Sequence, residues 1–179
     1  MFINKKNTKF IVLFFCFIIF SSIAQTNEDM PLNNMAINEI PKPIYSLIFE
    51  DFAGNKINLN QYKGKLVIVN FWATWCAPCK KEMPSLDKLS QSKKFKNLEV
   101  FAVNMENPNT TKTKKFFTDL NIKKLSIFFD SNLNFVKKFK LKGVPTTILI
   151  NKEGAEFARI IGEVNFMDKK FLKWLSKYD

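Results

Sequence analysis

Two cysteines three residues apart, Cys76 and Cys79, leave this chain few ways to fold. They follow an apolar run at residues 66–69, which has the character of a buried strand, and they stand where a helical pattern begins. The free amide groups and the dipole at the start of a helix stabilise a thiolate. A thiol pair in this position therefore predicts a redox couple held between a buried strand and a helix N-terminus.

A structural role explains the pair less well. The third cysteine, Cys16, lies in a leader-like segment, so the pair has only itself to bond with. A disulfide across such a short loop stabilises a fold by roughly 2 kcal/mol, compared with roughly 3 kcal/mol for a loop of about fifteen residues. The chain also has no histidine and no second cysteine pair to complete a zinc site. We therefore favour redox chemistry over a structural bridge or half of a zinc site.

Residues 1–24 have the three-part pattern of a secretory signal peptide. Three lysines come first, an apolar run follows at residues 10–20, and small residues at 22–24 offer a cleavage site. A membrane-spanning helix needs roughly 20 apolar residues, so the run is short for a retained anchor, which is the alternative. We therefore expect an exported protein, located in the periplasm or on the outer face of the cytoplasmic membrane.

The rest of the chain divides into an arm and one domain. Residues 25–44 are polar, contain three prolines and show no clear periodicity, which predicts a linker or flexible arm. Residues 45–179 alternate strand-like and helix-like segments and predict an α/β domain, with a mixed sheet flanked by helices on both faces. Strands are expected at 45–49, 56–59, 66–71, 98–103, 126–129, 146–150 and 155–161, and helices at 76–92, 110–120, 132–139 and 166–177.

The formal net charge is +12, and lysines are scattered from residue 80 onward rather than gathered in one block. This pattern fits a lysine-rich composition that solvates the surface. A basic face for an acidic partner or a lipid surface is the alternative. Nucleic acid is a poor partner for an exported chain that has no recognisable binding motif.

Three stretches carry a more specific signal: residues 70–79 (NFWATWCAPC), 82–84 (EMP) and 143–147 (GVPTT). They resemble the thioredoxin-fold family and, within it, the exported TlpA/ResA type of thiol-disulfide oxidoreductase. The resemblance covers about residues 45–179 and implies a thioredoxin-like domain. A Cys-x-x-Cys motif alone is a weak signal. Here the motif lies between an expected strand and helix, and a Val-Pro-Thr follows about 65 residues later, before another expected strand.

Position predicts different roles for the two thiols. Cys76, at the helix start, is expected to attack the disulfide of a partner protein as a thiolate. Cys79, nearly one turn further in, is expected to resolve the mixed disulfide. Ala77 and Pro78 lie between them and tune the couple, because Pro78 pre-sets the first helical turn and Ala77 adds no charge.

The resemblance also implies a surface on which substrates dock. Pro145 is expected in the cis form beside Cys76, where the backbone of Val144 can pair with an extended substrate strand. Trp75 is expected to form part of the same surface. The alternative for Pro145 is an ordinary proline at the entry to a strand.

Glu82 is the predicted proton partner of the cysteine pair. It lies three residues after Cys79 on the same helical face, and TlpA/ResA-type proteins carry an acidic residue at this distance from the pair. Partial burial would raise its pKa and let it exchange the proton of the resolving thiol. Many thioredoxins have a buried aspartate near the position of Asn70, and this chain has a neutral amide there, so Asn70 is predicted to tune the couple together with Ala77 and Pro78. The alternative for Glu82 is a solvated glutamate near Lys80 and Lys81.

We therefore predict an enzyme that reduces oxidised protein thiols outside the cytoplasm and needs no cofactor or resident metal. The resemblance implies apocytochrome c as a common substrate and a membrane thiol carrier as the electron donor, with membrane attachment through the N-terminal segment as a further option. The motif does not fix the direction, so an oxidase or isomerase role stays open. Two other classes also stay open: a thiol peroxidase, which would need an arginine near Cys76, and a copper-binding assembly chaperone, which would ordinarily use a histidine.

Overall fold

The strand that precedes the cysteine motif, β4 (Leu66–Trp72), is the centre of the fold. Every one of its side chains is buried in the computed structural model, which describes residues 30–45, 47–130 and 133–179. It pairs in parallel with β5 (Leu98–Asn104) and antiparallel with β7 (Thr146–Ile150). A strand buried on both faces requires a layer on each side of the sheet.

Within the described residues, the strands form one eight-stranded mixed sheet in the order β1-β8-β7-β4-β5-β6-β2-β3. Of the strand pairs in the described part of the chain, β4–β5 and β5–β6 are parallel and the others antiparallel. The fold predicted from the sequence, an α/β fold with a mixed sheet, is confirmed. The other strands are β1 (Met35–Pro43), β2 (Ile48–Asp51), β3 (Lys56–Asn58), β6 (Ile127–Phe129) and β8 (Ala155–Ile161).

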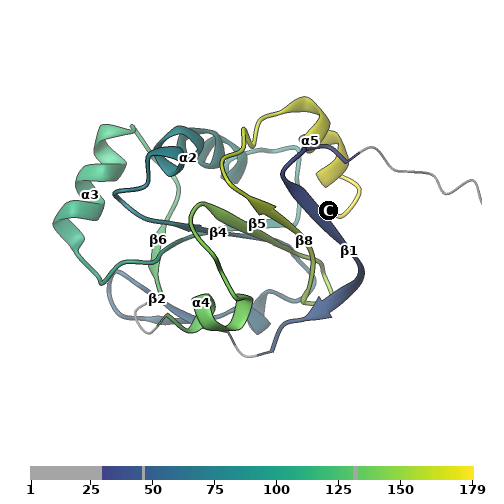
Figure 1. Cartoon of the computed structure of the whole chain (residues 1–179), viewed down its shortest axis with the longest axis horizontal. Helices are drawn as coiled ribbons and strands as arrows, with labels where there is room; N and C mark the ends of the chain where they lie inside the picture. Colours follow the sequence, from purple (N-terminus) through teal and green to yellow (C-terminus); the bar gives the residue numbers. More distant parts are fainter. Residues whose placement is uncertain (1–29, 46, 131–132) are drawn as a thin grey trace, which may run out of the picture. The chain divides into compact units, whose positions relative to one another are not determined.

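Helices cover both faces of the sheet, as predicted (Figure 1). One hydrophobic cluster packs α2, α3 and α5 against one face, and a second packs α4 and a short 3-10 helix against the other. The even-numbered apolar residues of β4 belong to the first cluster and the odd-numbered ones to the second, because successive side chains of a strand point to opposite faces. The helices are α2 (Ala77–Ser90), α3 (Thr110–Asp119), α4 (Asn134–Phe139), α5 (Lys169–Leu175) and the 3-10 helix η1 (Leu59–Tyr62).

The last helix is shorter than the sequence pattern predicts, because a capping residue fixes where it begins. The Asp168 side chain accepts hydrogen bonds from the backbone N–H groups of Lys170 and Phe171. This is the arrangement that an N-cap aspartate provides, and α5 therefore begins at Lys169 rather than at residue 166.

The predicted signal peptide at residues 1–24 lies outside the described residues. Among the residues that are described, no helix is long and apolar enough to cross a membrane.

The prediction of a linker over residues 25–44 is wrong for most of the described part of that range. Strand β1 occupies Met35–Pro43 and pairs antiparallel with β8 along the edge of the sheet. Only Met35 is buried, so the strand lacks the apolar alternation by which strands are recognised. Its two prolines are tolerated because an edge strand has one side without a hydrogen-bonded neighbour. The compact unit of the chain accordingly begins at Pro31 rather than at residue 45.

We expect β1 to contribute to the stability of the domain through Met35. Its side chain is 3% exposed and lies in the cluster beneath α2 and α5, so Met35→Ala should lower the free energy of unfolding by about 2–5 kcal/mol. Ile40 lies on the same strand and is 83% exposed, so Ile40→Ala should change the free energy of unfolding by less than about 0.5 kcal/mol. Denaturant unfolding of the oxidised protein measures both values. Equal, small effects would mean that β1 is not part of the cooperative fold.

Candidate active site

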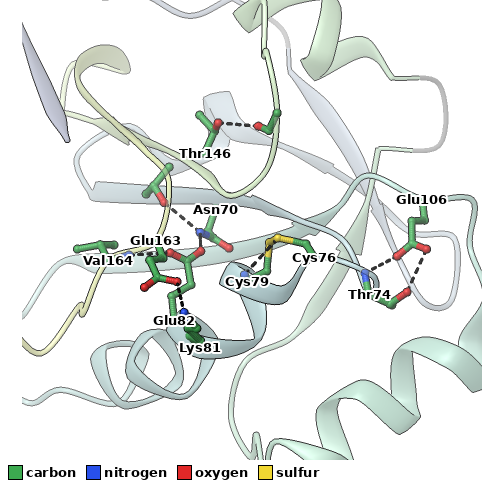
Figure 2. Close-up of a disulfide and its surroundings, with 12 residues drawn as sticks. Asn70, Thr74, Cys76, Cys79, Lys81, Glu82, Glu106, Thr146, Glu163 and Val164 are labelled. Carbon is green, nitrogen blue, oxygen red and sulfur yellow. Dashed lines mark hydrogen bonds and ion pairs between the residues drawn. A yellow bond between two sulfur atoms is a disulfide. The ribbon is translucent and has the colours of Figure 1, made fainter.

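The two cysteines form a disulfide at the N-terminus of α2 (Figure 2). Cys76 is the N-cap residue, and its sulfur accepts a hydrogen bond from the backbone N–H of Cys79 at 3.2 Å. Pro78 lies in the first helical turn, where its missing N–H costs nothing. The first amide groups of a helix have no partner within the helix, so they are free to stabilise negative charge on Cys76 after reduction.

Both cysteines are buried, and their surroundings differ. Cys79 is completely buried, whereas Cys76 keeps 3% of its surface and is followed by the exposed residues Ala77 and Pro78. Trp75, directly before Cys76, is 68% exposed. Tryptophan is enriched at protein interfaces, because its large apolar ring also carries an N–H donor. A partner protein can therefore approach the pair only from the Cys76 side.

The peptide bond between Val144 and Pro145 is cis, as the resemblance implies. Thr146 pairs with Phe71 of β4, so this peptide lies at the same end of the sheet as the loop that carries Cys76. Pro145 is buried and its carbonyl accepts a hydrogen bond from Gly162 N–H, whereas Val144 is half-buried. Among the described residues, no hydrogen bond uses the Val144 backbone, which leaves its N–H and C=O free for an extended chain.

Glu82 is buried one turn after Cys79, so the alternative of a solvated helix glutamate is wrong. Its side chain is 2% exposed, and each carboxylate oxygen has one hydrogen-bond donor. Asn70 Nδ2 donates to Oε1 at 2.7 Å, and the Val164 backbone N–H donates to Oε2 at 3.1 Å. Burial raises the pKa of Glu82 from 4.5 to about 7, against the opposing effect of the two hydrogen bonds. The carboxyl group is therefore poised to exchange a proton near neutral pH.

A cleft of about 210 Å³ that is open to solvent lies beside Glu82. An ion pair between Lys81 and Glu163, at 3.5 Å, lies at this cleft. The cleft gives the buried carboxyl group a route for proton exchange with solvent that does not pass through the surface around Trp75. The residues that line it are Lys81, Glu82, Ser85, Glu163, Val164 and Asn165.

Asn70 connects the central strand to the helix and to the neighbouring strand. Its Nδ2 group donates to Glu82 and also to the hydroxyl of Thr147 on β7, at 3.0 Å. Thr147 has no predicted role, although it lies in the motif that ends in two threonines. Its contact follows from register, because Thr147 is the direct cross-strand neighbour of Asn70.

A second carboxylate, which no sequence pattern indicates, fixes the loop in front of Cys76. Glu106 accepts hydrogen bonds from the backbone N–H of Thr74 at 2.5 Å and from its hydroxyl at 3.0 Å. Lys112 on α3 pairs with the same carboxylate at 2.8 Å. These donors hold the pKa of Glu106 below its usual range, although burial opposes them. No motif surrounds Glu106, so only the sheet, which brings the end of β5 beside that of β4, could have revealed it.

Known proteins are similar to this chain in sequence and in fold. The chain is 38% identical over 109 residues to the thiol-disulfide oxidoreductase ResA of Halalkalibacterium halodurans, an alignment that spans 61% of each protein. It is 34% identical over 125 residues to the ResA protein of Bacillus thuringiensis, which covers 70% of this chain and 71% of the relative.

Two solved structures show the same fold at lower identity. A thioredoxin-family thiol:disulfide interchange protein of Chlorobium tepidum superposes with a TM-score of 0.64 at 22% identity, over 78% of this chain and 99% of the other. StoA of Bacillus subtilis gives a TM-score of 0.58 at 23% identity, over 79% and 98%. The Redoxin family model matches residues 39–170, which is more than half of the sequence. The chain is therefore a member of the Redoxin family.

Proposed function

We propose that this protein is a thiol-disulfide oxidoreductase that reduces the disulfides of other proteins outside the cytoplasm. The observation that carries the proposal is the buried Glu82, which lies one helical turn from Cys79 and has a pKa of about 7. A buried disulfide that served only as a staple would have no need of a proton acceptor beside it. The names of the ResA relatives support the same class of reaction.

The reaction begins at Cys76. Its thiolate attacks one sulfur of the client disulfide, so that the client S–S bond breaks and a Cys76–client bond forms. The client thiolate that leaves takes up a proton from solvent. The helix N-terminus favours the attacking thiolate, and burial of Cys79 keeps that thiol away from the client.

Cys79 then releases the client. Its thiol loses a proton to Glu82 and attacks the Cys76 sulfur, so that the intramolecular disulfide forms and the second client thiolate leaves. The client has gained two electrons, and the cysteine pair has lost two. Glu82 passes its proton to solvent through the cleft beside it. Each new cycle needs two electrons from a donor, for which we propose a membrane thiol carrier.

Docking of the client uses the surface around Cys76. The unpaired N–H and C=O of Val144 can form strand-like hydrogen bonds with an extended client segment, next to Pro145. The exposed ring of Trp75 adds apolar contact on the other side of Cys76. Backbone pairing makes few demands on client sequence, so oxidised proteins as a class are the substrates. We propose apocytochrome c as one of them, on the basis of the resemblance to the TlpA/ResA type.

Two observations separate this proposal from the other classes. The sole arginine, Arg159, lies on β8 and is fully engaged, because it binds the Glu156 carboxylate and donates to the Phe139 carbonyl. It is therefore not placed to activate a peroxide at Cys76. The chain also has no histidine to join the two thiols as a copper ligand. Neither observation supports the peroxidase or the copper chaperone.

The first prediction for this function is a trapped intermediate. In the reduced Cys79→Ala variant, Cys76 can attack a client but nothing can resolve the product, so mixed disulfides should accumulate on non-reducing gels. The matched Cys76→Ala variant should trap none, because Cys79 is buried. Both variants should lose at least about 100-fold in the rate of reducing a test substrate such as insulin. Trapping by Cys76→Ala but not by Cys79→Ala would reverse the two roles.

The midpoint potential of the cysteine pair tests whether the protein reduces or oxidises its clients. A reductant should have a potential closer to the roughly −270 mV of thioredoxin than to the roughly −180 mV of protein disulfide isomerase. Equilibration with defined mixtures of reduced and oxidised glutathione or dithiothreitol gives this value. A potential above about −180 mV would assign the protein to the oxidases or isomerases instead.

Glu82 should also make stability depend on pH. Its pKa in the folded protein, about 7, lies above the 4.5 of an unperturbed glutamate, so the folded state binds more protons than the unfolded state between these values. The contribution of Glu82 to the free energy of unfolding should therefore be largest below pH 4.5. It should fall by about 3 kcal/mol in total as the pH rises through 7.

Glu82→Gln should remove this fall, because a glutamine does not titrate in this range. Glu163→Gln is the matched control, since it alters the neighbouring exposed carboxylate and should keep most of the pH dependence. Denaturant unfolding of the three oxidised proteins from pH 4 to pH 8 measures the effect. Parallel curves for the wild type and Glu82→Gln would contradict a raised pKa at Glu82.

A further inference from the structure

One polar atom beside the disulfide has no hydrogen-bond partner among the described residues. Asn70 is completely buried, and its Nδ2 group donates to Glu82 and to Thr147. Its amide oxygen, Oδ1, accepts nothing. Buried acceptors are nearly always bonded in native proteins, so an unbonded one calls for an explanation in the function of the site.

The ionised form of Glu82 sets the orientation of this amide. Glu82 Oε1 lies 2.7 Å from Nδ2, and an ionised carboxylate oxygen can only accept a hydrogen bond. Reversing the amide would place two oxygens against each other at that distance. While Glu82 is ionised, the NH₂ group therefore faces Glu82 and the oxygen faces the other way.

The oxygen faces the cysteine pair. Asn70 lies on the same face of β4 as Ile68 and Trp72, whose cluster also contains Cys79. Glu82, which Asn70 contacts directly, is one helical turn from Cys79 on α2. Figure 2 shows the red oxygen of Asn70 directed toward the sulfurs, on the side away from Glu82.

The oxidised protein offers this oxygen no proton. Neither sulfur of a disulfide carries hydrogen, whereas reduction by two electrons and two protons breaks the S–S bond and gives two thiols. The helix N-terminus favours loss of the proton from Cys76, so the hydrogen that remains is on the fully buried Cys79. A thiol is a weak donor that can bond to a carbonyl oxygen.

We infer that Asn70 is a positioning residue whose Oδ1 accepts a hydrogen bond from the Cys79 thiol, and that this bond exists only in the reduced protein. The inference rests on the proposed function, because it assigns a role in the same exchange reaction. Asn70 holds Cys79 as a protonated thiol, aimed toward the interior, while Cys76 attacks the client. An amide oxygen does not take the proton itself, so Glu82 remains the acceptor in the second step.

The bond stabilises the reduced state relative to the oxidised state, so its removal makes the protein more reducing. In Asn70→Leu, which has a similar volume and no acceptor, the equilibrium with glutathione should shift about tenfold toward the disulfide, or about 30 mV for this two-electron couple. Thr147→Val is the matched control, because it removes another partner of Asn70 and leaves Oδ1 in place. It should shift the equilibrium by less than twofold. An unchanged equilibrium in Asn70→Leu, or an equal shift in both variants, would overturn the inference.

A spectroscopic test does not depend on how Asn70→Leu folds. In the full chain carrying Cys16→Ser and Cys76→Ser, Cys79 is the only thiol, and its S–H stretch can be measured by infrared absorption with Asn70 intact. A hydrogen bond should lower the frequency below that of a free thiol in an apolar solvent. A frequency equal to that of the free thiol would overturn the inference. This result is independent of the client-trapping test, so failure of one does not imply failure of the other.

Discussion

The hydrogen bond between Asn70 and Glu82 is the contact on which the site depends. It joins the central strand β4 to the helix α2 at 2.7 Å, inside the core and one turn from Cys79. An ionised carboxylate in such a place is costly unless it is bonded, and among the described residues two donors offset the loss of water at Glu82. Burial therefore prevails over the hydrogen bonds and raises the pKa of Glu82 to about 7. A solvated glutamate at the same position in the helix would be ionised throughout the neutral range and would be a poor match to a thiol proton.

Four separate segments of the chain hold this arrangement, which makes it sensitive to the whole fold. Asn70 comes from β4, Glu82 from α2, Thr147 from β7, and the Val164 N–H from the loop between β8 and α5. Leaving a buried polar group without a partner costs about 1–3 kcal/mol. Displacement of any one segment would therefore destabilise the fold, because a polar group on another segment would lose its partner. Cooperative folding of the sheet and its helices is therefore what keeps the carboxyl group beside the thiols.

The local parts of this design could be predicted from the sequence, and the long-range parts could not. The strand before the motif and the helix that begins at the cysteines follow from short-range patterns of apolar and polar residues. Glu82 follows from its helical spacing after Cys79 together with the family resemblance. Val164 and Glu106 take part through contacts with residues 82 and 32 positions away, and nothing local marks them. Thr147 lies in the motif at residues 143–147, but the motif does not indicate its contact with Asn70, 77 positions away. Strand β1 was missed for a related reason. Its pairing with β8 is backbone hydrogen bonding at an edge, which leaves no apolar alternation and tolerates Pro41 and Pro43.

The neutral amide at Asn70 and the acid at Glu82 form a matched pair. A carboxylate at position 70 would stand about as close to Glu82 as the amide does, and two carboxylates in hydrogen-bond contact cannot both ionise. They would share one proton and titrate as a unit, so that neither could serve the thiol independently. With an amide at position 70, Glu82 ionises by itself, stabilised by two N–H donors, and the free amide oxygen is left on the side of the cysteines. The division of labour follows from chemistry: the acid moves the proton, and the amide, which cannot ionise, holds the thiol in place.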